Sequence, residues 1–423
     1  MRSWLFLFLG MPLSALAQDD IWGDDDWADE EMVSTWSGFV EAGLGLRIVD
    51  DPLIDTSSTL EDLRLRLEGE WEPGRYKLNF KGDAWHDGVD DELDGEVRDL
   101  TVSFTAGKST DMRLGRQVQT WGTGDLLFLN DLFPKDFVSF FSGREDEYLK
   151  APGDAVRLTH YGEKINIDFV WTPTFEPDVY LTGERFSFFS PLAGSNVAPE
   201  PRLSAREPGH SLANGEFAVR LFRTVDGAEY AVYGYHGFFK QPNALTAGFE
   251  PTFAPLDVWG ASLRRPAGPG LFNVELAYYD SRDDSNGTDA LLPNSQLRVL
   301  AAFEWEAKQN FTVSFQYYLE QTLHYSELVS NSFAPQLEPE EYRQILTNRL
   351  TYRAGMDRFT WSLFTFFSPS DKDFYVRPAL SYRHSDQWTL VAGANLFGGD
   401  KPQTFFSQLQ DASNVYLRLR FHY

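Results

Sequence analysis

Arginine recurs on one side of an alternating pattern in many segments of this chain. Arg64 and Arg66 stand two positions apart with an apolar residue between them, and so do Arg418 and Arg420. A guanidinium presents its donors in a fixed fork and binds carboxylate or phosphate through two parallel hydrogen bonds. Arginines that line a passage favour anions. The candidates for such a lining are Arg64, Arg66, Arg157, Arg220, Arg298, Arg349, Arg353, Arg377, Arg418 and Arg420.

The same arginines have a second interpretation. Acids occur on the same faces, among them Glu68, Asp168 and Glu320. Opposite charges on neighbouring strands attract one another, so the arginines would pair with these acids and stiffen a wall of strands. Both interpretations stay open, because the two roles are compatible at different heights of one wall.

Residues 122–153 form a long connecting segment that is apolar for its kind. Its leucines and phenylalanines between Leu126 and Phe141 are too numerous to leave in water. A connection of this length usually has a function. We expect it to pack against an inner wall and narrow a passage; the alternatives are a cap outside the wall and packing on a neighbouring subunit. The constriction candidates are Arg116, Gln117, Trp121, Asp125, Asp131, Lys135 and Asp136.

The sequence has few residues arranged for catalysis or for metal binding. The seven histidines are scattered and lie in neither a G-x-S-x-G nor an H-E-x-x-H context. The absence of cysteine excludes disulfides, thiolate metal sites and cysteine nucleophiles. Acidic stretches at 87–96 and 280–289 hold oxygen ligands for a hard cation, but neither has EF-hand spacing. We expect no enzyme, no cofactor and no metal site.

Composition narrows the class of protein. The 423 residues carry 37 basic and 63 acidic side chains, a formal charge of −26. This balance argues against nucleic acid as a partner, since phosphate binding needs clustered lysine and arginine. Aromatic residues make up 15% of the chain, which is too much for a disordered acidic protein.

Alternation with a period of two runs through most of the chain. In the last segment Val415, Leu417 and Leu419 share one face, while Arg418 and Arg420 share the other. This period indicates β-strands with two different faces. We count about eighteen such segments, with sixteen as the alternative count.

The connections between these segments alternate short and long. Short ones such as 72–75 and 384–387 alternate with long ones such as 122–153 and 173–213. Aromatic residues flank several short turns, at the depth of a membrane interface. The sequence therefore predicts an all-β fold, a transmembrane antiparallel up-and-down β-barrel with short periplasmic turns and long external loops. The proline-rich loop 173–213 is a candidate lid.

The N-terminus points to export. Residues 1–17 have a positive Arg2, an apolar stretch and the small-residue site Ala15-Leu16-Ala17, so we expect a signal peptide cleaved near Ala17. The alternative is a buried N-terminal helix or strand. Residues 18–35 form an acidic tail, expected to be solvated, with docking to a periplasmic partner or plugging of the lumen as alternatives. The barrel is expected over 36–423, in the outer membrane of a Gram-negative cell.

The stretch Gly115-Arg116-Gln117…Trp121-Gly122 resembles the GRQ…WG segment of several outer-membrane porin-like families, including alginate-export-type barrels. The resemblance covers about ten residues and the general barrel plan. It implies an electropositive channel for an anionic polymer and marks Arg116 and Gln117 as lumen or constriction residues. The apolar segment from Leu126 to Phe141 departs from those families. Alternation from Met112 and Leu114 places Arg116 on the apolar face, so an inward Arg116 needs a bulge.

The leading functional prediction is a channel for small anionic or polar solutes, narrowed by the third external loop. The alternative is transport or export of an apolar or amphipathic molecule, such as a lipid or hydrocarbon, or of an anionic polysaccharide. Enzymatic and adhesive roles are disfavoured. The expected partners are membrane lipid and lipopolysaccharide, the small solute, and the barrel-assembly machinery through the strand that ends at Tyr423. A homotrimer is an open alternative.

Overall fold

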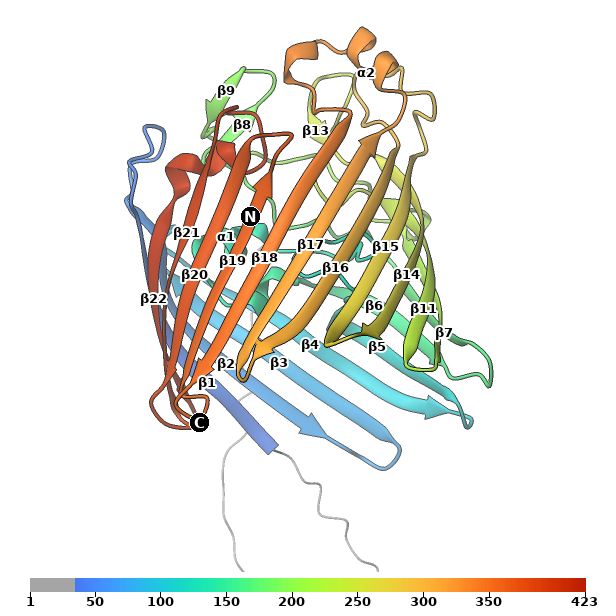
Figure 1. Cartoon of the computed structure of the whole chain (residues 1–423), viewed down its shortest axis with the longest axis vertical. Helices are drawn as coiled ribbons and strands as arrows, with labels where there is room; N and C mark the ends of the chain where they lie inside the picture. The colour runs from blue at the N-terminus through green and yellow to red at the C-terminus, as the bar shows by residue number, and fades with distance from the viewer. Residues whose placement is uncertain (1–34) are drawn as a thin grey trace, which may run out of the picture.

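Residues 35–423 form one closed antiparallel sheet of 18 strands in the computed structural model, which describes this part of the chain (Figure 1). The predicted signal peptide and nearly all of the predicted acidic tail lie outside the described residues. The strands are β1 (Thr35–Arg47), β2 (Ser58–Trp71), β3 (Tyr76–Asp87), β4 (Glu92–Ala106), β5 (Thr110–Val118), β6 (Pro152–His160), β7 (Asn166–Thr172), β10 (Glu216–Val225), β11 (Ala228–Phe238), β14 (Pro255–Ala267), β15 (Gly270–Ser281), β16 (Gln296–Lys308), β17 (Phe311–Thr322), β18 (Tyr342–Ala354), β19 (Phe359–Ser368), β20 (Asp373–Arg383), β21 (Trp388–Gly399) and β22 (Asn414–His422).

Pairing between the first and last strands closes the barrel. Val40 of β1 lies opposite Phe421 of β22, and Leu44 lies opposite Leu417. Each strand otherwise pairs with its neighbours along the chain, so the sheet has no free edge. The predicted eighteen-stranded antiparallel barrel is confirmed.

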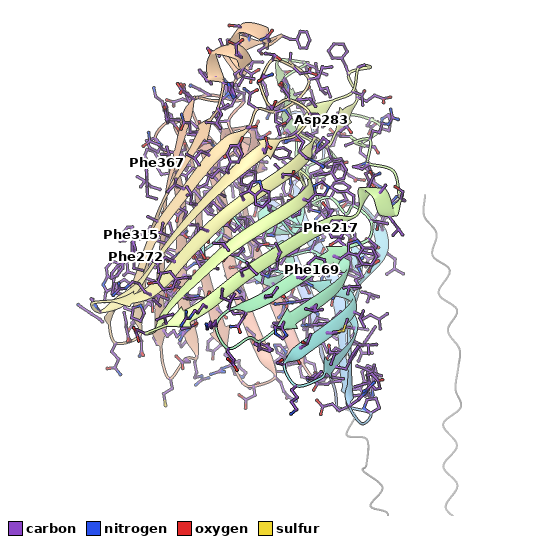
Figure 2. The ribbon with its side chains drawn as sticks, turned by 90° about the vertical axis from the view of Figure 1, so that its right-hand side faces the viewer. Phe169, Phe217, Phe272, Asp283, Phe315 and Phe367 are labelled. Carbon is purple, nitrogen blue, oxygen red and sulfur yellow. The ribbon has the colours of Figure 1, made fainter. Side chains whose placement is uncertain are left out.

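The two faces of the wall differ as the alternation predicts. Leu63 and Leu65 are 59% and 47% exposed, whereas Arg64 and Arg66 between and beside them are buried inside. Figure 2 shows aromatic side chains such as Phe217 and Phe315 on the outer surface of the strands. An apolar outside and a polar inside is the arrangement that a barrel adopts in lipid. Among the described residues, no helix has the length and apolar character needed to cross a membrane.

Turn chemistry explains the short connections. Between β10 and β11 the chain turns on Asp226 and Gly227, both with positive φ, 50° and 76°. An Asp-Gly pair in this conformation is the preferred two-residue hairpin turn, because its twist matches that of the flanking strands. The short turns lie at one end of the barrel and the long loops at the other.

The long loops contain further short elements. These are α1 (Phe137–Ser142), η1 (Asp146–Leu149), β8 (Phe188–Ser190), β9 (Ser195–Val197), η2 (Leu212–Asn214), β12 (Ala244–Leu245), β13 (Pro251–Thr252), α2 (Tyr325–Asn331), η3 (Pro335–Leu337) and η4 (Ser407–Ala412).

The connection between β5 and β6, residues 119–151 and here called loop 3, folds into the barrel. Its α1 places Phe140 and Phe141 against Tyr375 and Phe397 of the inner wall, with ring centroids 5.4–6.1 Å apart. Aromatic pairs at such distances add to the free energy of burial. Loop 3 is thus anchored by a hydrophobic core inside the barrel.

A second anchor holds loop 3 from the opposite part of the wall. Trp121 packs edge-on against Phe133 within the loop and lies 6.1 Å from the ring of Tyr233 on β11. The Tyr279 hydroxyl on β15 donates to the Leu129 carbonyl oxygen at 2.6 Å. Because both anchors are buried, loop 3 crosses the lumen in a defined position.

Candidate functional site

Six arginines on four strands face the lumen. They are Arg64 and Arg66 on β2, Arg349 on β18, Arg377 on β20, and Arg418 and Arg420 on β22. Alternation places them inward, since their neighbours in sequence face outward. We call this set the arginine wall. All six belong to the lining that the sequence predicted.

Four carboxylates of the wall itself contact these arginines, and one of them, Glu68 of β2, lies 3.7 Å from Arg66 and 3.1 Å from Lys81. Asp83 of β3 accepts two hydrogen bonds from Arg66, at 2.6 and 2.7 Å, and one from Arg64 at 3.2 Å. Glu41 of β1 lies 2.9 Å from Arg420 and 3.4 Å from Arg418. Asp62 of β2 lies 3.5 Å from Arg64. These pairs match the interpretation in which the arginines stiffen the wall.

Loop 3 supplies four further carboxylates. Asp125 pairs with Arg349 through two hydrogen bonds, at 2.5 and 3.0 Å. The other three, Glu145, Asp146 and Glu147, are consecutive and lie at and just after the start of η1.

We call Glu145, Asp146 and Glu147 the carboxylate hub. Glu145 forms an ion pair with Arg420, and Glu147 forms one with Arg66. Asp146 pairs with Arg377 and lies 3.9 Å from Arg349. One turn of chain therefore contacts strands β2, β18, β20 and β22.

The charges of wall and loop balance in this region. The six guanidiniums of the arginine wall, together with Lys81 of β3, meet four wall carboxylates, Glu41, Asp62, Glu68 and Asp83, which leaves three positive charges. Loop 3 brings the hub and Asp125 but also Arg144, which binds Asp62 at 2.7 Å. The loop therefore contributes three negative charges, and the cationic excess of the wall is neutralised from within the lumen.

Aromatic rings hold the guanidiniums in place independently of the acids. Phe39 on β1 lies between Arg66 and Arg420, with its centroid 5.0 and 3.9 Å from their guanidinium carbons. Arg349 lies 4.6 Å from the ring of Phe364. Such cation–π contacts are worth about 0.5–2 kcal/mol each, so the arginine wall is fixed before any anion binds.

Tyr148 is the centre of a second group of contacts. Its ring lies 4.5 Å from the guanidinium carbon of Arg64, 5.1 Å from that of Arg66 and 4.9 Å from that of Arg98 on β4. Its hydroxyl accepts a hydrogen bond from Arg66 at 2.9 Å. Arg98 also donates to the carbonyl oxygens of Glu147 and Lys150, at 3.0 and 2.7 Å. These bonds tie η1 to β2 and β4.

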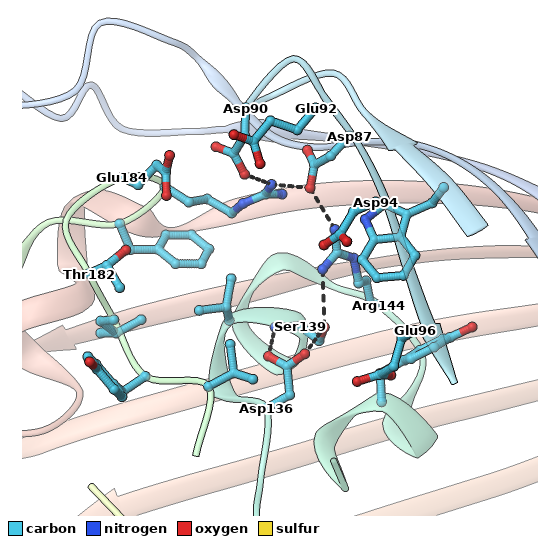
Figure 3. Close-up of a pocket in the computed structure, with 18 of the residues that line it drawn as sticks. Asp87, Asp90, Glu92, Asp94, Glu96, Asp136, Ser139, Arg144, Thr182 and Glu184 are labelled. Carbon is cyan, nitrogen blue, oxygen red and sulfur yellow. Dashed lines mark hydrogen bonds and ion pairs between the residues drawn. The ribbon is translucent and has the colours of Figure 1, made fainter. Parts of the chain in front are cut away.

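Two cavities lie on either side of η1. The outer one, of about 300 Å³, is lined by Tyr148 and by an excess of acids, which are Asp87, Asp90, Glu92, Asp94, Glu96, Asp136 and Glu184 (Figure 3). The inner one, of about 680 Å³, is lined by five cations, which are Lys81, Arg98, Arg113, Lys150 and Arg349, and by four acids, which are Asp99, Asp125, Asp146 and Glu147. Loop 3 thus divides the lumen into an acidic outer part and a more basic inner part.

Asp87 is one of the places where loop 3 meets the loop between β7 and β10 (residues 173–215, here loop 4). Asp87, at the end of β3, accepts from Arg144 of loop 3 at 2.9 Å and forms an ion pair with Arg185 of loop 4 (Figure 3). Arg185 also contacts Asp90 at 2.6 Å. Loop 4, the predicted lid, is therefore joined to loop 3 above the outer cavity.

Burial and charge shift two acid groups in these loops. Burial opposes the charged form of Asp146, but the Arg377 guanidinium outweighs burial and holds the pKa of this carboxyl below its ordinary value. Burial raises the pKa of Asp178 in loop 4 to about 6, although the nearby Lys135 opposes the shift. Asp146 is therefore a fixed anion at neutral pH, while Asp178 titrates in the mildly acidic range.

The remaining predicted lining residues lie elsewhere on the wall. Arg157 pairs with Asp168, Arg220 with Glu229 at 2.6 Å, and Arg298 with Glu320 at 3.2 Å. These three are neutralised on their own or adjacent strands. Arg353 is exposed near the turn that follows β18.

The predicted constriction residues divide into two groups. Asp125 lines the inner cavity and Asp136 the outer one, where Asp136 also caps α1 by accepting from the Ser139 backbone at 2.7 Å. Asp131 and Lys135 form a buried ion pair at 2.9 Å within loop 3.

Trp121 ties loop 3 to the wall, whereas Gln117 joins β5 to β6 within the wall. The Trp121 ring nitrogen donates to Asp168 at 3.2 Å. The Gln117 amide donates to the carbonyl oxygens of Gly115 and Ala155, at 3.2 and 3.1 Å.

Arg116 does not face the constriction. It lies opposite Leu100, an outward residue that is 58% exposed, and its side chain contacts Asp154 and Glu176 at the loop end of β5. The register of β5 with β4 and β6 has no shift, so the bulge that an inward Arg116 needs is missing. The register shift lies instead between β3 and β4, at Lys81 and Gly82.

Sequence reasoning missed the carboxylate hub, Tyr148 and Arg98. The hub lies in a loop, where no periodicity marks the direction of a side chain. Its only signal is composition, because Glu145, Asp146 and Glu147 form the one run of three acids in loop 3. Among residues 35–423, no cluster of three or more histidine or acid side chains is arranged to hold a metal ion.

Comparison with known proteins supports the fold. No protein-family profile matches the sequence, and no curated relative matches it. Among solved structures, OccAB2 of Acinetobacter baumannii matches with a TM-score of 0.54 at 11% identity, covering 92% of this chain and 98% of that one. OccK2 (OpdF) of Pseudomonas aeruginosa in complex with glucuronate matches with a TM-score of 0.53 at 9% identity, covering 92% and 97%. At this identity the likeness shows the fold, which is that of outer-membrane barrel porins; it does not extend to the alginate-export resemblance.

Proposed function

We propose that this protein is an outer-membrane channel for small anionic solutes, which pass between the acidic outer cavity and the more basic inner cavity at the level of η1. The observation that carries the proposal is the arginine wall. Six guanidiniums are held by aromatic rings and wall acids beside the place where loop 3 narrows the lumen. Fixed charge matters most in a narrow passage, since a desolvated ion interacts more strongly there.

The structural neighbours support this class of function. OccK2 is described in complex with glucuronate, a small carboxylate, and it shares the barrel fold of this chain. Guanidiniums such as Arg349 and Arg377 are the side chains that bind such a group in a bidentate way. Glucuronate is therefore a reasonable first probe.

The alternative substrates have less support. A path for a lipid or hydrocarbon requires an apolar lining, but the two cavities on either side of η1 are lined largely by charged side chains. An anionic polysaccharide requires a wide bore, whereas loop 3 is anchored on opposite parts of the wall. A small solute fits both observations.

Location and partners are part of the same proposal. The apolar outer face, with rings such as Phe315 exposed, is suited to lipid and lipopolysaccharide. The β22 strand ending at Tyr423 would be presented to the barrel-assembly machinery. The tail over 18–35 would lie on the periplasmic side, where β1 begins. We propose export by cleavage near Ala17.

Planar-bilayer recording tests the proposal. The purified protein in a potassium chloride gradient should give discrete conductance steps, a reversal potential of the sign expected for chloride preference, and concentration-dependent block by glucuronate. Absence of any conductance, or a clear preference for potassium without glucuronate block, contradicts it. The matched probe is glucose, a neutral sugar of similar size, which should block far less.

A further inference from the structure

The carboxylate hub occupies the positions that an anionic solute would need. Arg377 and Arg349 have no ion-pair partner on the wall among the described residues, and their partners, Asp146 and Asp125, both come from loop 3. Arg66 and Arg420 share their wall acids with a neighbouring arginine and gain a further partner each, Glu147 and Glu145. The strands of the wall therefore carry more positive charge than their own carboxylates neutralise.

The exposed fractions of the side chains show which partner of each ion pair faces the open lumen. The side chains of Glu145, Asp146 and Glu147 are 41%, 48% and 36% exposed, whereas those of Arg66 and Arg377 are 2% and 8% exposed. The hub covers the arginines, and a solute entering the inner cavity meets the carboxylates first. Arg349 already lines the inner cavity and is 24% exposed, whereas the guanidiniums of Arg66 and Arg377 become accessible only where a hub side chain gives way.

The hub side chains can give way without unfolding loop 3. The loop is anchored outside the hub, by apolar contacts such as Phe141 against Phe397 and by hydrogen bonds such as that from Tyr279 to the Leu129 carbonyl oxygen. The side chain of each hub acid is bound to the wall only through its charged end, while the Glu147 backbone carbonyl keeps its bond from Arg98. A partly exposed side chain has free rotamers to adopt. A competing anion would replace one charge-assisted hydrogen bond by another of similar strength.

We infer that the carboxylate hub is an internal competitor for the solute, and that the arginine wall is built for solutes carrying two anionic groups. This inference rests on the proposed function and names the solute class. Two guanidiniums, Arg349 and Arg377, already lie near one carboxylate, Asp146, on adjacent parts of the wall. A dicarboxylate displaces two hub acids and gains two guanidinium contacts, while a monocarboxylate displaces one. The hub thereby discriminates against monoanions, because each exchange of partners is nearly neutral in energy and only a solute with two contacts shares the entropy cost of its immobilisation between them.

The test compares two variants with the same change of charge. The hub variant carries Glu145→Gln, Asp146→Asn and Glu147→Gln. The control variant carries Glu92→Gln, Asp94→Asn and Glu184→Gln, which line the outer cavity; among the described residues Glu184 pairs with Arg202, and none of the three forms an ion pair with the arginine wall. Both remove three negative charges and keep side-chain size. Heat-modifiable migration on gels confirms that each barrel is folded.

Calorimetric titration of the detergent-solubilised proteins with succinate, and with its monoamide succinamate, reads out binding directly. The hub variant should bind succinate at least tenfold more tightly than the natural protein, and the control should change less than threefold. Adding Arg349→Gln and Arg377→Gln to the hub variant should abolish the gain. An unchanged succinate affinity in the hub variant, or an equal gain in both variants, overturns the inference. Because titration needs no current, a protein that binds succinate in this way but conducts nothing refutes the proposed channel and leaves the competition standing.

Discussion

Arg377 of β20 and Asp146 of loop 3 form an ion pair between residues 231 positions apart in the sequence. Arg377 also lies 4.8 Å from the ring of Phe140 in the same loop and donates to the Arg144 carbonyl oxygen at 3.3 Å. One wall arginine thus contacts α1, η1 and the chain between them. This relationship adds a link between loop 3 and β20 to the buried anchors that hold the loop across the lumen.

Removal of Arg377 should loosen loop 3 on the side of β20. Arg377→Ala leaves Asp146 with only the 3.9 Å contact to Arg349 and removes the cation–π contact with Phe140. We expect frequent short closures or openings in single-channel records, with the barrel still folded. Arg353→Ala, an exposed arginine at the far end of β18, is the control and should leave the records steady. Identical records from the two variants contradict the anchoring role.

The aromatic contacts between loop 3 and the inner wall lead to a second prediction, which does not depend on the ion pairs. Phe141 is 1% exposed and packs against Tyr375 and Phe397. Phe141→Ala removes buried apolar contacts worth about 3–5 kcal/mol, so loop 3 should become sensitive to protease in the intact barrel. Phe367→Ala removes a ring that is 49% exposed on the outer face and should not change the digestion. Equal protection of loop 3 in both variants would refute the anchor.

Tyr148 separates the two cavities and should control the size of the passage. Tyr148→Ala removes a buried ring that contacts Arg64, Arg66 and Arg98. We expect a conductance at least twofold higher, because the narrowest part of the lumen widens. The outward Tyr230, 51% exposed, provides the control variant Tyr230→Ala. A conductance unchanged by Tyr148→Ala means that solutes pass elsewhere.

The raised pKa of Asp178 predicts that the stability of the loop junction around it depends on pH. The Asp178 carboxylate accepts from the Lys135 backbone and from the Gln241 amide, both at 2.7 Å, and so joins loops 3 and 4 to the connection between β11 and β14. Since its pKa is raised to about 6 in the folded protein, the folded state binds more protons than the unfolded state between about pH 4 and 6. The contribution of Asp178 to the stability of this junction therefore falls as pH rises through that range.

Thermal unfolding followed from pH 4 to 7 checks this prediction. The midpoint temperature of unfolding of the natural protein should contain a contribution that decreases as pH rises from about 4 to 6. The variant Asp178→Asn should lack that contribution. Asp386→Asn, in an exposed short turn, is the control. A pH profile that is the same in natural and Asp178→Asn proteins contradicts the assignment.

The alternation of the chain was sufficient to predict the barrel and the inward arginines. Arg64 and Arg418 face the lumen because a period of two leaves a strand residue only two directions. The same rule places Arg116 outward, and the structure follows the rule where the resemblance to a porin segment implied otherwise. Local pattern was more reliable than a ten-residue likeness.

The partners of the arginines could not be predicted from the chain. Glu147 lies in a loop and meets Arg66 81 positions away, through a path set by the packing of Phe140, Phe141 and Trp121. No periodicity gives the direction of a side chain in such a segment. The contacts correspond to the interpretation in which the arginines pair with acids, such as Asp83 of the wall and Glu147 of loop 3, and the anion-favouring lining stays a prediction.

The conductance of the protein without residues 126–141 tests the central claim most directly, because that stretch carries α1 and most of the apolar anchor. If loop 3 divides the lumen and determines what passes, single channels of this variant should conduct several times more than those of the natural protein, and their reversal potential in a salt gradient should shift further toward chloride as the arginine wall becomes exposed. A folded variant with unchanged conductance and reversal potential would contradict the account.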